Sequence, residues 1–105
     1  MENKYANCIK ICQQCIIDCQ NCLINMGGKD SMNDCPICCA LCIDACLVCV
    51  KFLAANSSYA KEYCKLCADI CTWCAQQCGE HDHEHCKICA QSCMLCAAEC
   101  EKIAA

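Results

Sequence analysis

The stretch CIKICQQCIIDCQNC, residues 8–22, places five cysteines at alternating spacings of four and three residues. Side chains three and four residues apart lie on one face of an α-helix. The alternation is the a/d pattern of a coiled coil, with thiols at the positions that Leu and Ile normally occupy. This stretch therefore predicts a helix whose inward face is lined by cysteine.

The same pattern occurs three more times along the chain. In each set of five cysteines the first and last lie fourteen residues apart, and Cys38 is an additional cysteine outside the pattern. The four sets are Cys8, Cys12, Cys15, Cys19 and Cys22; Cys35, Cys39, Cys42, Cys46 and Cys49; Cys64, Cys67, Cys71, Cys74 and Cys78; and Cys86, Cys89, Cys93, Cys96 and Cys100. The register predicts four equal columns of thiols that share one core.

Turn and cap residues separate the four segments. Gly27-Gly28 ends the first segment, and Gly79 ends the third. Asn33 and Asp34 are candidate caps for the second segment, and Pro36 suits its first turn. Asn56-Ser57-Ser58 and Asp82 are candidate caps for the third and fourth. We expect helices over about 5–26, 35–54, 58–78 and 83–103 in a single domain spanning residues 1–105. Loops this short make neighbouring helices antiparallel, so the predicted fold is all-α, an up-down-up-down four-helix bundle with a cysteine-lined core.

Antiparallel packing sets the cysteines in five layers of four. Reversing the second and fourth helices places Cys8, Cys49, Cys64 and Cys100 in one end layer and Cys22, Cys35, Cys78 and Cys86 in the other, about 21 Å away at about 1.5 Å per residue. Apolar residues beside the cysteines are expected to pack between the helices. These are Ile9, Ile16, Leu23, Leu41, Leu66, Ile70, Ile88 and Leu95, and Met94 is also expected in the core.

Composition excludes several classes of protein. The 21 cysteines among 105 residues are an odd number, and three Gly and one Pro are few for a loop-rich disulfide scaffold. Side chains three or four apart in a helix are also too distant for disulfides. The first residues contain no export signal, so we expect a reducing cytoplasm. The net charge of -4 and the short apolar runs indicate neither a nucleic-acid partner nor a membrane span.

Buried thiolates select soft metals, namely Cu(I), Zn(II) or iron-sulfur clusters. Zinc takes four ligands, so the column would hold about five sites, each of charge about -2 in a dry core. Cu(I) accepts two or three thiolates, and it can bridge a gap too wide for a disulfide. Neutrality of the core requires nearly one Cu(I) per thiolate, which predicts about twenty ions. The pairs four residues apart that offer such gaps are Cys8/Cys12, Cys15/Cys19, Cys35/Cys39, Cys42/Cys46, Cys67/Cys71, Cys74/Cys78, Cys89/Cys93 and Cys96/Cys100.

The two ends of the predicted bundle differ in chemistry. One collects the thioethers and imidazoles of Met26, Met32, His81, His83 and His85, which bind Cu(I) more weakly than thiolate and suit an uptake site. The other collects the aromatic side chains of Tyr5, Phe52, Tyr59 and Tyr63, which we expect to close it.

The stretch CGEHDHEHC, residues 78–86, is similar to the H-D-H-x-H-C loop of cytosolic members of the bacterial copper storage proteins. Together with the repeated C-x-x-x-C motifs, this resemblance covers residues from about 5 to 103. It implies a cytoplasmic, non-catalytic Cu(I) store that assembles as a homotetramer and exchanges copper with donor or acceptor proteins. The Cys-Pro-Ile-Cys-Cys stretch from Cys35 to Cys39 is denser in cysteine than the family pattern.

Two other functions stay open at this point. A metallothionein-like buffer for zinc or cadmium would use the same thiols. A thiol-disulfide redox protein would use C-x-x-C pairs such as Cys12/Cys15 and Cys71/Cys74, although such pairs ordinarily act at a helix N-terminus.

Overall fold

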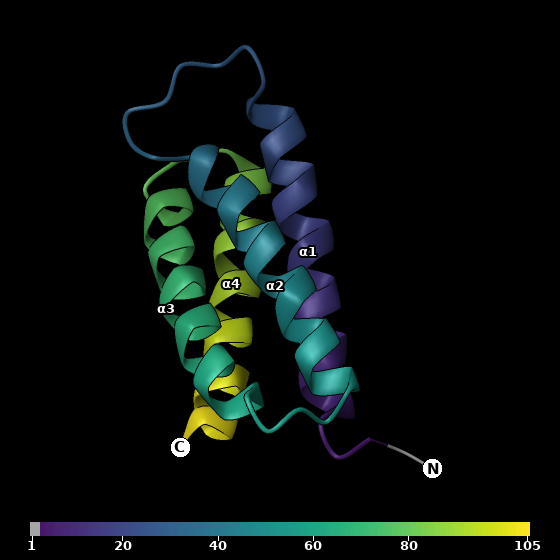
Figure 1. Ribbon diagram of the computed structural model, residues 1–105. Helices are drawn as coiled ribbons and strands as arrows, with labels where there is room; N and C mark the ends of the chain where they lie inside the picture. Colours follow the sequence, from purple (N-terminus) through teal and green to yellow (C-terminus); the bar gives the residue numbers. More distant parts are fainter. Residues whose placement is uncertain (1–2) are drawn as a thin grey trace.

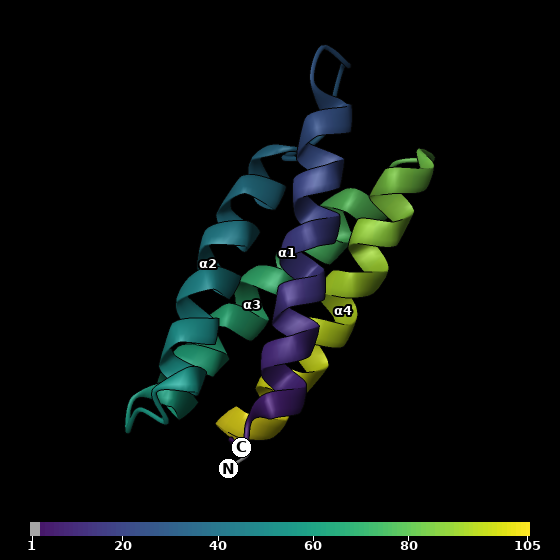
Figure 2. The same cartoon turned by 90° about the vertical axis from the view of Figure 1, so that its right-hand side faces the viewer.

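The computed structural model describes residues 3–105, and this part of the chain contains four α-helices and no strand. The helices are α1 (Ala6–Met26), α2 (Ile37–Ala54), α3 (Ala60–Gly79) and α4 (Glu84–Ala104). Figure 1 shows them running alternately up and down, with α1 beginning and α4 ending at the same end. Each helix packs on the next, and α4 packs on α1 (Figure 2). The predicted antiparallel four-helix bundle is confirmed.

The helix starts differ from the predicted ones. Helix α2 begins at Ile37, two residues after the predicted start, and Cys35 lies in the preceding turn. A proline ring disfavours helical backbone in the residue before it. Pro36 therefore keeps Cys35 out of the helix and delays the start of α2. The Oδ1 atom of Asn33 accepts a hydrogen bond from the Cys35 amide at 3.0 Å, so this turn has its own local support.

The starts of α3 and α4 also differ from the predicted ones. Asn56 adopts a left-handed φ of 53°, and Ser57 Oγ accepts a hydrogen bond from the Tyr59 amide at 3.1 Å. These turns delay α3 to Ala60. Helix α4 is preceded by His83 in an extended conformation, with no side-chain cap hydrogen bond, so the expectation that Asp82 caps α4 is wrong.

All 21 cysteines are buried, and they form most of the core. Small residues lie beside them where larger apolar ones were predicted: Leu41, Leu66, Ile88 and Leu95 are exposed, and so is Met94. The buried small residues are Ala45, Ala60, Ala68, Ala75, Ser92 and Ala97. Cysteine is itself small, so small neighbours let the helices approach closely enough for the thiols to fill the core. The prediction of a large-residue packing layer was therefore only half right, since Ile9, Ile16, Leu23 and Ile70 do pack against the core.

The end of the bundle away from the α1–α2 loop, here called the closed end, is sealed differently from the prediction. Leu53 is fully buried there, whereas Tyr59 is exposed. Phe52 and Tyr63 meet edge to face with ring centroids 5.0 Å apart, and the Tyr63 hydroxyl donates to the carbonyl of Ala45 at 2.9 Å. Tyr5 and Tyr63 pack against the core as predicted, so aromatic side chains close this end together with the aliphatic Leu53 and without Tyr59.

Helix α2 is long and apolar enough, by length and composition, to cross a membrane. Asp44 and Lys51 nevertheless divide its apolar residues into short runs, as the sequence analysis expects. Much of its apolar character comes from cysteines that face the core of the bundle, including Cys42, Cys46 and Cys49.

Candidate metal centre

The thiols form a connected column along the bundle axis. None of the 21 cysteines, all within the described residues 3–105, is in a disulfide. Neighbouring Sγ atoms lie 3.5 Å apart at Cys39 and Cys78 and 4.0 Å apart at Cys8 and Cys100. A disulfide bond measures about 2.05 Å. Two metal–sulfur bonds of about 2.3 Å reach across as much as about 4.6 Å, so single metal ions fit these gaps.

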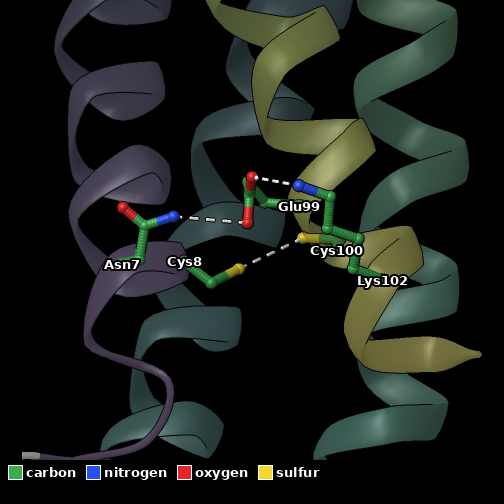
Figure 3. Close-up of polar contacts among 5 residues, drawn as sticks. All are labelled: Asn7, Cys8, Glu99, Cys100 and Lys102. Carbon is green, nitrogen blue, oxygen red and sulfur yellow. Dashed lines mark hydrogen bonds and ion pairs between the residues drawn. The ribbon is translucent and has the colours of Figure 1, made fainter.

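The end layers pair as the register predicts. In the layer at the closed end, Cys8 and Cys100 point toward each other from α1 and α4 (Figure 3), and the Cys49 and Cys64 sulfurs lie 3.8 Å apart. Beside this layer Glu99 accepts a hydrogen bond from Asn7 and pairs with Lys102 at 3.0 Å. The Asn7–Glu99 hydrogen bond joins α1 to α4 at the surface, outside the thiols, and the Glu99–Lys102 pair lies within α4.

The opposite end layer is linked as well. The Cys22 sulfur lies 3.6 Å from that of Cys86 and 4.0 Å from that of Cys35, and Cys78 lies 3.7 Å from Cys35. All four predicted members are thus joined by sulfur contacts, although Cys35 is outside the helix. The layered register is confirmed at both ends.

Contacts in the middle of the column run between layers as well as within them. Cys42 lies 3.9 Å from Cys15, 3.6 Å from Cys71 and 3.9 Å from Cys93, within one predicted layer. Cys93 also lies 3.6 Å from Cys19, which belongs to the next layer. The sulfurs therefore form a continuous network in which one sulfur can bridge several metal ions.

Two of the predicted pairs four residues apart have their sulfurs in contact. The Cys15/Cys19 and Cys74/Cys78 sulfurs each lie 3.9 Å apart. Because linear coordination spans about 4.6 Å, a metal ion between sulfurs at this separation would be held in a bent arrangement.

Cys38 lies inside the column even though the five-layer register has no place for it. It is fully buried, and its sulfur is 3.8 Å from that of Cys78. Cys35, Cys38, Cys39 and Cys78 have sulfurs that all lie within 4.8 Å of one another. Cys38 therefore adds one thiol to the column beyond the twenty of the five layers, at the point where α2 begins.

At several thiols hydrogen bonds lower the pKa, whereas burial raises it. Hydrogen bonds from Cys100 and Cys12 lower the pKa of Cys8 to about 5, and hydrogen bonds from Cys39 and Cys78 lower the pKa of Cys22 to about 6. Burial raises the pKa of Cys35 to about 12. The network therefore holds some thiolates, each stabilised by neighbouring thiols that keep their protons. Metal binding releases the protons that are left.

The mouth end, where α1 and α3 finish and α2 and α4 begin, brings Met26 and His85 to the thiols. Met26 is buried, and its sulfur lies 3.8 Å from Cys86 Sγ. His85 Nδ1 lies 3.5 Å from the same sulfur, and its buried Nε2 has no hydrogen-bond partner among the described residues. A thioether, a thiol and an imidazole thus meet at the end of the column.

The other three predicted mouth residues are placed differently. The His83 ring stacks on His85 with centroids 5.2 Å apart, and His81 stacks on the other side of His83 at 6.1 Å. His81 is buried, with Nε2 3.0 Å from Asn33 Oδ1. Met32 is 69% exposed on the α1–α2 loop, outside the thiol cluster.

Asn33 is a residue of this end that the sequence suggested only as a helix cap. Its Nδ2 donates to the Gln77 carbonyl at 2.8 Å and to Glu80 Oε1 at 2.7 Å, while its Oδ1 meets His81 and the Cys35 amide. One amide side chain therefore joins the α1–α2 loop to the end of α3 and to the loop after it. Asx-turn preference was the available signal, but the long-range partners come only from the fold.

The fold and the site together define a class of protein, a four-helix bundle whose interior is a column of thiols arranged to hold soft metal ions. The copper storage protein family model, Csp, matches residues 1–105. The chain belongs to this family.

Individual relatives agree with the family assignment. The uncharacterized cysteine-rich protein YhjQ of Bacillus subtilis (strain 168) is 38% identical over 77 residues, which is 73% of this chain and 68% of the relative. The Cu(I)-bound copper storage protein BsCsp3 superposes with a TM-score of 0.91 at 36% identity, over 96% of this chain and 98% of that one. The metal-free copper storage protein Csp3 from Bacillus subtilis superposes with a TM-score of 0.90 at 38% identity, over 96% and 99% of the two chains.

Proposed function

We propose that this protein stores and buffers Cu(I) through the thiolates of its core and performs no catalysis. The observation that carries the proposal is the column of 21 buried thiols, none in a disulfide, most of which are joined to one another by sulfur contacts of about 4 Å or less. Such sulfurs can each bridge more than one ion, which suits a metal that accepts two or three ligands. Membership of the copper storage family and the likeness to a Cu(I)-bound relative support the same function.

The proposed capacity follows from charge. A Cu(I) ion held by two private thiolates leaves a charge of -1 in a core from which water is excluded, and such burial is costly. Filling with nearly one ion per thiolate removes that cost. We therefore propose about twenty Cu(I) ions per chain, bound in clusters along the axis.

Uptake is proposed to occur at the mouth end. His85 and Met26 touch Cys86 there, His83 is exposed, and His81 completes the imidazole stack. Imidazole and thioether bind Cu(I) more weakly than thiolate, so an ion captured there passes inward to the thiols. Met32 belongs to this proposal only by its position on the adjoining loop.

The cellular setting is part of the proposal. Thiols stay reduced in the cytoplasm, where disulfides are rare, so a store made of free thiols suits that compartment. Copper donor or acceptor proteins are the expected partners. We also propose a homotetramer, which the family resemblance implies and which would cover exposed apolar side chains such as Ile17, Ile24 and Leu47.

Competition against a strong Cu(I) chelator tests the function. The reduced protein should take Cu(I) from the chelator, and most of the thiol column should bind zinc less tightly than it binds Cu(I). Weak Cu(I) retention together with tight binding of about five zinc ions per chain would favour the zinc or cadmium buffer instead. Loss of Cu(I) binding with reversible disulfide formation between one pair of cysteines would favour the redox protein.

A further inference from the structure

The start of α2 carries a motif of which the five-layer register uses only the first cysteine. Cys35-Pro36-Ile37-Cys38 has the C-x-x-C spacing of zinc ligand pairs. Cys35 is the one cysteine of the 21, all within the described residues, that lies outside a helix. Cys38 has no position in the five layers. Cys38 therefore departs from the register, and Cys35 keeps its layer while lying outside the helix.

Two further cysteines complete a group of four around this motif. The Cys78 sulfur lies 3.7 Å from Cys35, 3.8 Å from Cys38 and 3.5 Å from Cys39. All four sulfurs lie within 4.8 Å of one another, and none of the four residues is more than 1% exposed. In a tetrahedron with metal–sulfur bonds of about 2.3 Å the sulfurs are about 3.8 Å apart. The three distances to Cys78 match this value, and the other three sulfur pairs lie within 4.8 Å, so small side-chain shifts would close a tetrathiolate site.

Charge distinguishes this group from four-sulfur groups deeper in the bundle. A divalent ion with four thiolates carries about -2, which is costly in a low-dielectric core. Cys38 and Cys39 lie in the first turn of α2, where the positive end of the helix dipole favours negative charge. Cys15, Cys19 and Cys93 also belong to a four-sulfur group, but they lie in the middle of α1 and α4 and lack that support.

We propose that Cys35, Cys38, Cys39 and Cys78 bind one divalent cation of the zinc type in the copper-free protein. The ion ties the turn before α2 to the C-terminal end of α3, next to the hydrogen bonds that Asn33 makes to the same elements. The other seventeen of the 21 cysteines stay available for Cu(I). The site does not depend on the proposed storage function.

Cobalt(II) is the probe, because tetrahedral cobalt thiolates absorb visible light. The reduced, copper-free protein is titrated with Co(II), and we expect one tightly bound equivalent per chain that one equivalent of Zn(II) displaces. Cys38→Ser should lose this equivalent. Cys49→Ser is the matched control, because Cys49 is equally buried on the same helix but lies at the closed end; it should keep the cobalt signal.

Alkylation of the wild-type protein gives a readout that does not depend on how the variants fold. With one equivalent of Zn(II) bound, peptide mass spectrometry should show the slowest labelling at Cys35, Cys38, Cys39 and Cys78. The proposal is overturned if Cys38→Ser keeps the cobalt equivalent, if Cys49→Ser loses it equally, or if protection falls on the middle of the column. Copper capacity measured on the same samples separates the two proposals, because Cys38→Ser should lose only about one Cu(I) ion if the other twenty cysteines fill at about one ion each.

Discussion

Replacing Cys42 with Ala tests whether metal ions share sulfurs. Cys42 is fully buried and touches Cys15, Cys71 and Cys93 at 3.6 to 3.9 Å. In a network filled to neutrality, loss of one thiolate removes one negative charge, so Cu(I) capacity should fall by about one ion from about twenty. In a chain of separate four-thiolate sites the same change destroys a whole site, or about a fifth of the capacity.

The assay is a Cu(I) titration to saturation with metal and protein counted by mass spectrometry. Met94→Ala is the control, because Met94 is exposed on α4 and its loss should leave capacity unchanged. Deleting one buried sulfur costs roughly 1 kcal/mol of folding free energy, too little to unfold the bundle. A loss of four or more ions in Cys42→Ala would refute the shared network, and so would no loss at all.

Further predictions concern the mouth, the closed end, protons and the metal-free state. Substituting His81, His83 and His85 together with Ala should slow Cu(I) uptake in stopped-flow experiments while leaving capacity almost intact; unchanged kinetics would remove the imidazoles from the uptake route. Leu53→Ala should lower the free energy of unfolding by about 2–5 kcal/mol in urea titrations, because it opens a cavity at a fully buried position, and an unchanged midpoint would contradict that packing. Proton competition weakens Cu(I) binding as pH falls. Thiols with pKa values near 5 and 6, such as Cys8 and Cys22, are ionised at pH 7, so Cu(I) ions that bind to them should release few protons. Cu(I) ions that bind to Cys35, whose pKa is raised, should release more. Proton release per ion that stays constant throughout a titration at pH 7 would refute this order. Far-UV circular dichroism of the reduced, metal-free protein should already be strongly helical, and a disordered spectrum would mean that metal organises the bundle.

The cysteine spacing was sufficient to predict the helices and the layers, because residues three and four apart share a helix face whatever surrounds them. The Cys8–Cys100 and Cys22–Cys86 contacts follow from this register alone. Helix starts were less predictable, because they depend on turn geometry. At Cys35 the restriction imposed by Pro36 outweighed the spacing pattern.

Packing outside the cysteines could not be read from periodicity. Leu41 and Leu95 fit an apolar stripe, yet both are exposed, because alanine and serine fill several of the positions beside the small thiols. The roles of Leu53 at the closed end and of Asn33 at the mouth also depend on contacts between residues distant in the sequence. The Asn33 amide bonds to Gln77 and Glu80, which no local pattern indicates.

The Cu(I) content of the saturated wild-type protein tests the central claim most directly. The reduced protein is loaded with excess Cu(I), freed of weakly held metal by a chelator, and analysed for copper and protein. The thiol column predicts about twenty Cu(I) ions per chain. A saturated content of about five ions would contradict the account, because it would mean that the thiols act as isolated four-ligand sites.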